Sequence, residues 1–335
     1  MARPGQPTSD PAGLIGDLTA LGGAGAVVVE LPGDGEPLGA VAGIVRIAAH
    51  RAGRLPTEGL EAFDILLSAD PAAPRPWVGL PPDRLDAALG GLLGRIEAQP
   101  VAAAVAAQVL RVSLQVDFDE ALAMESVAYS MLLASDGFRA WRAATPVRER
   151  DEPDAPRVLI EAGGGAIRLQ LNRPGKRNAF DAAMRDALCE ALAFATDHPD
   201  RPLVELSGVG PAFSAGGDLD EFGNAGDVGS AHLVRTLRSP ARLLYGLRDN
   251  ATARLHGACV GAGIEVPAAA GRVTAKAGAF FRLPEVSMGL IPGAGGTATI
   301  PRRIGRQRAA YMAIFGADID VETALAWGLI DAVDP

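Results

Sequence analysis

Cysteine and histidine are scarce in this chain, which limits the sites that it can build. Its 335 residues include two cysteines, Cys189 and Cys259, and four histidines without a paired ligand spacing. Two cysteines are too few for a disulfide framework, so we expect a reduced, cytoplasmic protein in which both thiols are small buried residues. Because His and Cys ligands do not cluster, we expect no metal site.

Long apolar runs and basic runs are missing as well. No apolar stretch reaches the roughly 20 residues of a transmembrane helix, and the N-terminus lacks the charged-then-apolar pattern of a signal peptide. The formal net charge is −9, so we expect neither nucleic acid nor a membrane surface as a partner. An anionic ligand would need a local group of basic residues instead.

Small and apolar residues are plentiful. Hydrophobic residues make up 48% of the chain and aromatic residues only 5%, while glycine occurs 41 times. These values suit a globular protein of one large domain or two, with a tightly packed core of small side chains.

The first half of the sequence predicts a small strand-containing segment followed by helices. After residues 1–13, which we expect to be a disordered leader, the pattern within 14–80 is strand, helix, strand, which favours a parallel β-α-β unit. A helical region follows at 81–146 and a charged linker at 147–156. The expected elements are strands at 26–31 and 63–68, helices at 38–52, 83–98, 100–113, 118–133 and 136–143, and a proline-rich linker at 70–82.

The helix predicted at 118–133 has one apolar stripe. Met124, Val127, Met131 and Leu132 recur there at i, i+3, i+4 spacing. We interpret this stripe as core packing, and the alternative is contact with another subunit. Asp117 or Asp119 is the expected N-cap of this helix.

Residues 157–335 alternate strands with helices. Turns lie at the strand ends, so the pattern predicts an α/β fold whose site lies at the carboxyl ends of the strands. The expected elements are a hairpin at 157–171 around a glycine turn at 163–165, a helix at 181–196 with Asp181 as N-cap, strands at 203–207 and 252–255, and a helix at 231–247.

A glycine-rich turn at 257–263 runs into an apolar segment that we expect to be helical from about Ile264. Free N–H groups at a helix start suit a group that develops negative charge. Glu265 lies one turn in, and Glu285 follows in apolar surroundings before a tight loop at 291–297. Two carboxylates beside backbone donors are a layout for acid/base chemistry next to a stabilised oxyanion. The alternative is that these are ordinary turns between strands and helices, with two glutamates on the surface.

Three blocks in a fixed order extend this pattern. They are LQLNRPGKRNAF at 169–180, AFSAGGDL at 212–219, and the stretch 256–303 that contains both carboxylates. In this order they closely resemble the crotonase (enoyl-CoA hydratase/isomerase) superfamily, over residues 158–335. The resemblance implies a spiral of β-β-α units and a helical region that closes the site and builds a homotrimer or dimer of trimers. It implies no cofactor, because coenzyme A is part of the substrate.

By motif position, the resemblance implies that the backbone N–H groups of Gly217 and Ala262 hold the thioester oxygen of an acyl-CoA. Glu265 and Glu285 match the two family glutamates, one of which orients or deprotonates a water while the other protonates the α-carbon. The N–H of Gly293 would hold that water. Ala262 stands where the family usually has glycine, and a proline follows early in the helix, so a later helix start would point Glu265 elsewhere.

Coenzyme A binding is expected along the loop after LNRP. Lys176 and Arg177 would meet phosphates, and backbone groups near Ala179 would meet adenine. Asp218 and Leu219 would line the pantetheine path. The alternative for Lys176 and Arg177 is an exposed turn.

The order of the parts departs from the family. Members continue past the segment matching 327–333 into C-terminal helices, whereas this chain stops at Pro335. Residues 81–143 resemble that helical block, so the chain looks permuted; the alternative is a tandem of a decayed copy and a truncated one. Under either history we expect these helices to close the site, because an uncovered site would expose a large apolar surface.

The predicted function is an enoyl-CoA hydratase that adds water across a 2-enoyl-CoA. Family isomerases generally keep only the carboxylate matching Glu285, so the presence of both glutamates favours hydration. One alternative is another crotonase activity, namely an enoyl-CoA isomerase, an acyl-CoA hydrolase or a specialised biosynthetic step. The other is a non-catalytic family member that acts as a structural partner.

Overall fold

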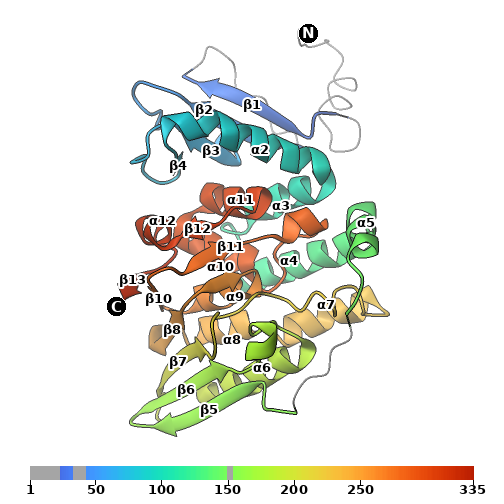
Figure 1. Cartoon of the computed structure of the whole chain (residues 1–335), viewed down its shortest axis with the longest axis vertical. Helices are drawn as coiled ribbons and strands as arrows, with labels where there is room; N and C mark the ends of the chain where they lie inside the picture. Colours follow the sequence, from blue (N-terminus) through green and yellow to red (C-terminus); the bar gives the residue numbers. More distant parts are fainter. Residues whose placement is uncertain (1–22, 33–42, 149–153) are drawn as a thin grey trace.

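The computed structural model describes residues 23–32, 43–148 and 154–335. Its elements stack in layers along the longest axis of the molecule (Figure 1), with a small sheet at one end, helices in the middle and a larger sheet at the other end. The leader predicted at 1–13 lies outside the described residues. Strands and helices alternate through the second half, which confirms the predicted α/β class.

The larger sheet holds most strands of the second half. Its order is β13-β10-β8-β7-β6-β5, and neighbouring strands run parallel except in the β5-β6 hairpin. Gly164 and Gly165 adopt φ of 62° and 76°, which lets this predicted hairpin turn tightly. The strands are β5 Val158–Gly163, β6 Ala166–Leu171, β7 Leu203–Gly208, β8 Ala251–Leu255, β10 Arg272–Lys276 and β13 Ala332–Asp334.

The first helix of the second half, α6 (Ala182–Asp197), lies against β5 and β6. It begins as predicted after Asp181, whose Oδ1 accepts a hydrogen bond from Met184 N at 2.7 Å. This cap satisfies one of the amide donors that a helix start leaves free, which explains why the boundary could be read from the sequence.

The single helix predicted at 231–247 is wrong. The chain forms two helices instead, α7 (Val228–Leu237) and α8 (Pro240–Gly246). Pro240 has no N–H with which to continue α7, and Ser239 Oγ accepts a hydrogen bond at 3.2 Å from the amide three residues on, which starts α8.

Short elements around glycine turns form the centre of the molecule. Helix α9 starts at Ala262, earlier than the expected Ile264, and passes after four residues into a 3-10 turn at Pro267–Ala269, because Pro267 interrupts the helical hydrogen bonds. The other elements here are β9 Ala258–Val260, β11 Phe280–Arg282, β12 Ile319–Asp320, α9 Ala262–Glu265, α10 Gly296–Ile304, α11 Arg306–Phe315 and α12 Val321–Trp327. Further 3-10 turns are Leu60–Ala62, Pro82–Arg84, Pro174–Lys176, Arg248–Asn250 and Glu285–Met288.

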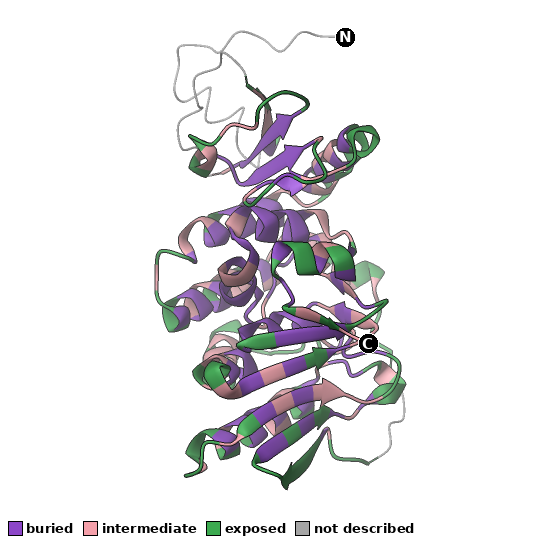
Figure 2. Cartoon of the chain, turned by 90° about the vertical axis from the view of Figure 1, so that its left-hand side faces the viewer, coloured by how far each residue is buried: buried purple, intermediate pink, exposed green. Residues whose placement is uncertain are grey.

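The small sheet is parallel throughout, in the order β1-β2-β3-β4. In the described part of the stretch 38–52, strand β2 (Val45–His50) replaces the predicted helix, so that prediction is wrong there. All of β2 is buried (Figure 2), and a strand covered on both faces lacks the alternation that would identify it. Strand β4 (Val78–Gly79) lies within the predicted linker at 70–82. Strands β1 (Ala26–Leu31) and β3 (Ile65–Ser68) were predicted.

The four helices predicted between 83 and 143 are confirmed. They are α2 Leu85–Ala98, α3 Pro100–Val112, α4 Phe118–Leu133 and α5 Asp136–Ala144. Asp117 caps α4 in a capping box with Glu120. Helix α4 packs against α7 and α10, and α3 packs against α11, so these helices cover the second half of the same chain (Figure 1). No helix in the described part of the chain is long and apolar enough to cross a membrane.

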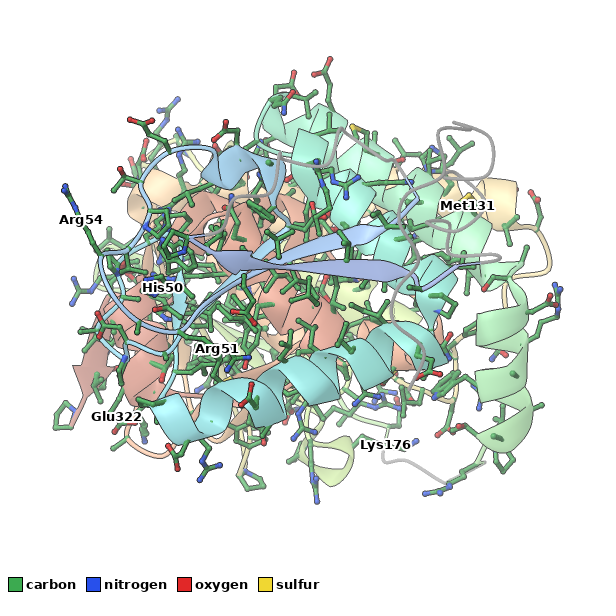
Figure 3. All side chains as sticks on the ribbon, turned by 90° about the horizontal axis from the view of Figure 1, so that it is seen from above. His50, Arg51, Arg54, Met131, Lys176 and Glu322 are labelled. Carbon is green, nitrogen blue, oxygen red and sulfur yellow. The ribbon has the colours of Figure 1, made fainter. Side chains whose placement is uncertain are left out.

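The prediction that one apolar stripe packs α4 into the core is confirmed for Leu132, which is buried, and is wrong for Val127 and Met131. Val127 and Met131 are 57% and 55% exposed, and Figure 3 labels Met131 on the ribbon of this helix. The buried face runs instead through residues 118, 121, 122, 125, 126 and 132. It has the same helical period, but its centre is Glu125, which is 2% exposed.

Candidate active site

A cavity of about 250 Å³ lies where α4, α7 and α9 meet two glycine-rich loops. Its wall includes Gly217, Ala262, Glu265, Glu285 and Gly293. These residues come from separate sequence blocks, and the structure brings them to one place. The cavity is therefore the candidate active site.

The loop around Gly217 and the turn before α9 are held together by backbone contacts. Ser214 N donates to Ala258 O at 3.2 Å, and Val260 N donates to Ser214 O at 3.0 Å. Gly216 has φ of 95°, and a Cβ there would lie 2.8 Å from Val260 O, so the approach requires glycine. This pairing places the amides of Gly217 and Ala262 on the same cavity.

Both predicted donor amides are free. Within the described residues, neither Gly217 N nor Ala262 N donates a hydrogen bond to another protein group, whereas the neighbouring Gly261 N donates to Arg282 O at 2.9 Å. Ala262 has no positive φ, so alanine fits where glycine is usual. Two unused N–H groups lining one cavity can stabilise a negatively charged oxygen.

The two predicted glutamates converge over Gly261. This glycine has φ of 50°, and a Cβ there would collide with Glu285 Oε1 and lie 3.7 Å from Glu265 Oε1. Both side chains are buried, at 2% exposure for Glu265 and 7% for Glu285. Because α9 begins at Ala262, Glu265 lies in its first turn, and its Oε1 is on the same side of Gly261 as Glu285 Oε1.

The surroundings of Glu265 stabilise its ionised form. Its Oε2 accepts hydrogen bonds from Ala294 N at 2.8 Å and Gly296 N at 2.9 Å. Burial raises the pKa of Glu265 to about 7, while the amides of these two residues and of Gly293 act in the opposite direction. It therefore ionises close to neutral pH.

The surroundings of Glu285 favour its protonated form. Its buried Oε2 has no hydrogen-bond partner in the described residues. Burial, and then the charge of Glu265, raise the pKa of Glu285 well above its ordinary value. The pair is thus divided into a carboxylate at Glu265 and a carboxylic acid at Glu285, the division that acid/base catalysis needs.

A third buried carboxyl group, Glu125 of α4, was missed from the sequence. Its Oε1 accepts from Gly295 N at 2.7 Å, and its Oε2 accepts from the N and Oγ1 of Thr297, each at 2.7 Å. Burial, and then the charge of Glu265, raise the pKa of Glu125 to about 8. Glu125 and Glu265 together hold the loop that carries Gly293. An acidic residue in the centre of an otherwise apolar helical face was the available signal.

No three His, Cys, Asp or Glu side chains are grouped to hold a metal ion in residues 23–32, 43–148 and 154–335. Shared protons and backbone amides account for the acidic groups at this cavity.

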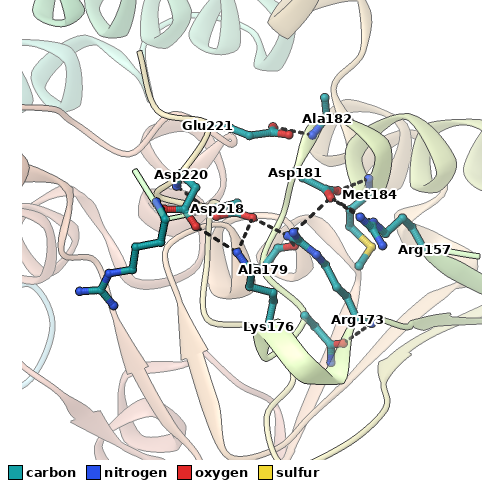
Figure 4. Close-up of polar contacts among 12 residues, drawn as sticks. Arg157, Arg173, Lys176, Ala179, Asp181, Ala182, Met184, Asp218, Asp220 and Glu221 are labelled. Atoms are coloured by element: carbon teal, nitrogen blue, oxygen red, sulfur yellow. Dashed lines mark hydrogen bonds and ion pairs between the residues drawn. The ribbon is translucent and has the colours of Figure 1, made fainter. Parts of the chain in front are cut away.

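The residues predicted to bind coenzyme A are only partly brought together. Lys176 Nζ lies 3.0 Å from Asp220 Oδ2 and 3.7 Å from Asp218 Oδ2 (Figure 4). Asp218 also pairs with Arg173 at 2.7 Å and lies on the cavity wall. Lys176 is therefore already paired with two carboxylates. The sequence offered either a phosphate contact or an exposed turn for this residue, and these pairs were not predicted.

The other three predicted coenzyme A residues lie outside the cavity wall. Arg177 is exposed, in a left-handed conformation with φ of 51°. Ala179 is buried and its carbonyl accepts from Arg173 Nη1 at 3.0 Å. Leu219 is 39% exposed, and its carbonyl accepts from Arg142 Nη1 of α5 at 2.6 Å.

Comparison with known proteins gives the same family as the sequence motifs. The model of the enoyl-CoA hydratase/isomerase family matches residues 161–335. A mevalonyl-coenzyme A hydratase of Beauveria bassiana is 32% identical over 188 residues, which cover 54% of this chain and 64% of that protein. An enoyl-CoA isomerase/hydratase of Mycosarcoma maydis is 33% identical over 193 residues, which cover 55% of this chain and 69% of that protein.

Solved structures resemble this chain in both fold and sequence. An enoyl-CoA hydratase from Thermoplasma volcanium superposes with a TM-score of 0.50 at 32% identity, over 54% of this chain and 72% of that one. The chain thus matches about two thirds of the length of these relatives, and the matched part contains Gly217, Ala262, Glu265 and Glu285.

Proposed function

Because the chain belongs to the enoyl-CoA hydratase/isomerase family and has its crotonase fold, we propose that it is an acyl-CoA enzyme that adds water across a 2-enoyl-CoA. The observation that carries the proposal is the pairing of Glu265 with Glu285 over Gly261, beside the free amides of Gly217 and Ala262. A thioester oxygen bound by both amides would place carbons 2 and 3 of the acyl chain at the two carboxyl groups.

The proposed reaction begins with polarisation of the thioester. The N–H groups of Gly217 and Ala262 donate to its oxygen, and each such donor contributes about 10²- to 10³-fold in rate because negative charge grows on that oxygen. The electron-poor carbon 3 then accepts the oxygen of a water molecule. Gly217 and Ala262 act through their backbone N–H groups, so neither position needs a polar side chain.

The two carboxyl groups move the protons. Ionised Glu265 accepts one proton from the attacking water, and Glu285 gives its proton to carbon 2, which yields the 3-hydroxyacyl-CoA. This leaves Glu265 protonated and Glu285 ionised, and proton exchange between the coupled groups restores the starting state. We propose that the Gly293 amide helps to hold the water, since it lies on the cavity wall beside Glu265.

We propose that coenzyme A follows the loop of residues 173–180 into the cavity, past Asp218 and Leu219. Arg177 is exposed and has no ion-pair partner among the described residues, so it is the cation best placed for a phosphate. Lys176 would have to leave Asp220 to do the same. Assembly as a homotrimer or dimer of trimers stays a prediction from the family resemblance.

Hydration is tested against isomerisation by the product. Incubation with crotonyl-CoA should add 18 mass units and remove the absorbance of the enoyl-thioester band. A wild-type protein that only interconverts 2-enoyl and 3-enoyl thioesters, with no gain in mass, would show that Glu285 works alone and that the enzyme is an isomerase.

A further inference from the structure

One cation on the cavity wall has no part in the proposed reaction. Arg235 of α7 lines the cavity together with Glu125, Tyr129 and both catalytic glutamates. It also lines the adjoining hollow between α7 and the loop at 221–227, so it lies where the cavity opens beyond the reacting centre. The inference drawn from it rests on the proposed function, because it concerns the substrate of the same site.

The protein contacts of Arg235 are neutral. Its Nε donates to Ser126 Oγ at 3.1 Å, and its Nη2 donates to Ser126 O at 3.4 Å and to Ser130 Oγ. The guanidinium carbon lies 4.9 Å from the centre of the Tyr129 ring. Within the described residues, no carboxylate comes within 4.0 Å of Arg235, and no protein acceptor is hydrogen-bonded to its Nη1.

The two other arginines on this wall differ in this respect. Arg185 Nε lies 2.9 Å from Asp186 Oδ1, and Arg238 Nη1 lies 3.6 Å from Glu190 Oε1. Their charges are balanced by the protein itself. Arg235, more deeply placed than the exposed Arg238, is the wall arginine whose charge the described part of the chain leaves without a counter-ion.

The acidic groups that line the same cavity are bound to protein groups other than Arg235. Asp181 and Asp218 both pair with Arg173, at 3.5 Å and 2.7 Å. Glu221 Oε2 accepts from the Ala182 amide at 2.8 Å. Glu125 is bound to the loop amides and holds a proton near neutral pH.

A half-buried cation without an anion is costly, because burial removes water and the neutral partners Ser126, Ser130 and Tyr129 replace it only in part. Burial lowers the pKa of Arg235, and the smaller effects of Tyr129 and Glu125 act in the opposite direction. In a chain with an overall charge of −9, such a local cation can attract an anion to this part of the cavity. Substrate binding would supply the missing partner.

We propose that the acyl chain of the substrate carries a carboxylate, and that Arg235 binds it through the free Nη1 edge. The substrate class is therefore an ω-carboxylated 2-enoyl-CoA rather than a plain fatty enoyl-CoA. Arg235 acts as a specificity residue: it positions the far end of the acyl chain while the amides of Gly217 and Ala262 hold the thioester end.

Binding is tested with saturated thioesters, which cannot react. Calorimetry compares glutaryl-, adipyl-, pimelyl- and suberyl-CoA with their neutral monomethyl esters on the full-length wild-type protein. At one of these lengths the acid should bind about 10- to 100-fold more tightly than its ester, the range of a charge-assisted hydrogen bond in a shielded site. Arg235→Gln should remove this preference, and Arg235→Lys should keep part of it because the charge remains.

The matched control is Arg238→Gln, which removes a paired arginine from the same wall and should leave the preference unchanged. Equal binding of acid and ester by wild type at every length would overturn the proposal. An equal loss of acid and ester binding in Arg235→Gln would overturn it as well. That result would mean that Arg235 only holds α7 against α4. The wild-type comparison decides the question even if a variant fails to fold.

Hydration is measured separately, so that the two proposals fail in different ways. If wild type hydrates crotonyl-CoA but shows no preference for a carboxylate, Arg235 has no such role and the hydratase stands. If wild type prefers the carboxylated thioesters but hydrates neither crotonyl-CoA nor the ω-carboxylated 2-enoyl thioesters, the reaction is wrong and the Arg235 site stands.

Discussion

Ala262→Pro would remove one of the two proposed oxyanion donors with little other damage. Proline lacks the N–H, and Ala262 is the first residue of α9, a position at which proline is favoured. The amide has no acceptor in the described residues, so no existing hydrogen bond is lost. Gly261 precedes it in a non-helical conformation, with φ of 50° and ψ of −122°, and glycine lacks the Cβ that would clash with a following proline ring.

The expected loss is that of one charge-stabilising donor. Removing such a group costs about 10²- to 10³-fold in kcat, or about 3–4 kcal/mol of transition-state stabilisation. The ring also occupies the space in front of the former amide, so the thioester binds less well. We therefore expect kcat/KM to fall by at least about 10²-fold.

The assay is the hydration of crotonyl-CoA by Ala262→Pro beside Ala262→Gly, which keeps the amide. The glycine variant should stay within about tenfold of wild type, since it changes only a methyl group and backbone freedom, which costs roughly 1 kcal/mol. Thermal unfolding should show similar melting temperatures for both variants. A proline variant that folds normally and keeps wild-type kcat/KM would refute the assignment of the Ala262 amide.

Three further predictions follow from the acidic groups and the covering helices. The kcat/KM should rise with pH through about 7 as Glu265 ionises and fall at higher pH as Glu285 loses its proton, and a flat profile between pH 5.5 and 9 would contradict the division of roles. Glu125→Ala leaves two loop amides without acceptors and should lower the free energy of unfolding in urea by about 2–6 kcal/mol, whereas Asp119→Ala on the exposed side of α4 should change it by less than about 1 kcal/mol. Deleting residues 1–145 should yield an insoluble or inactive core, because α4 forms part of the cavity wall, and a soluble, active fragment would contradict that account.

The residues that the sequence predicted well are those fixed by local backbone requirements. Gly261 must adopt a positive φ beside two carboxylates, and the turn that contains it starts a helix, so the positions of Ala262 and Glu265 follow from a short motif. Glu285 likewise stands in a short apolar block. Such features depend on few distant contacts and can be read along the chain.

The residues that were missed depend on distant contacts. Glu125 is buried because loop amides about 170 positions away bind it, and no local pattern contains them. The apolar stripe through Val127 and Met131 was equally regular but faces outward. Strand β2 gave no alternation because all of its residues are buried, and the sequence around Lys176 did not indicate its pairing with Asp220.

The central claim is that Glu265 and Glu285 act together on one enoyl thioester. Its most direct test is the initial rate of absorbance loss at the enoyl-thioester band for wild type, Glu265→Gln and Glu285→Gln, with acyl-CoA binding measured on the same samples by calorimetry. Turnover by wild type, its loss in both variants and nearly unchanged binding in all three would agree with a two-carboxylate hydratase. Turnover that survives either substitution, or binding that is lost with it, would contradict the account.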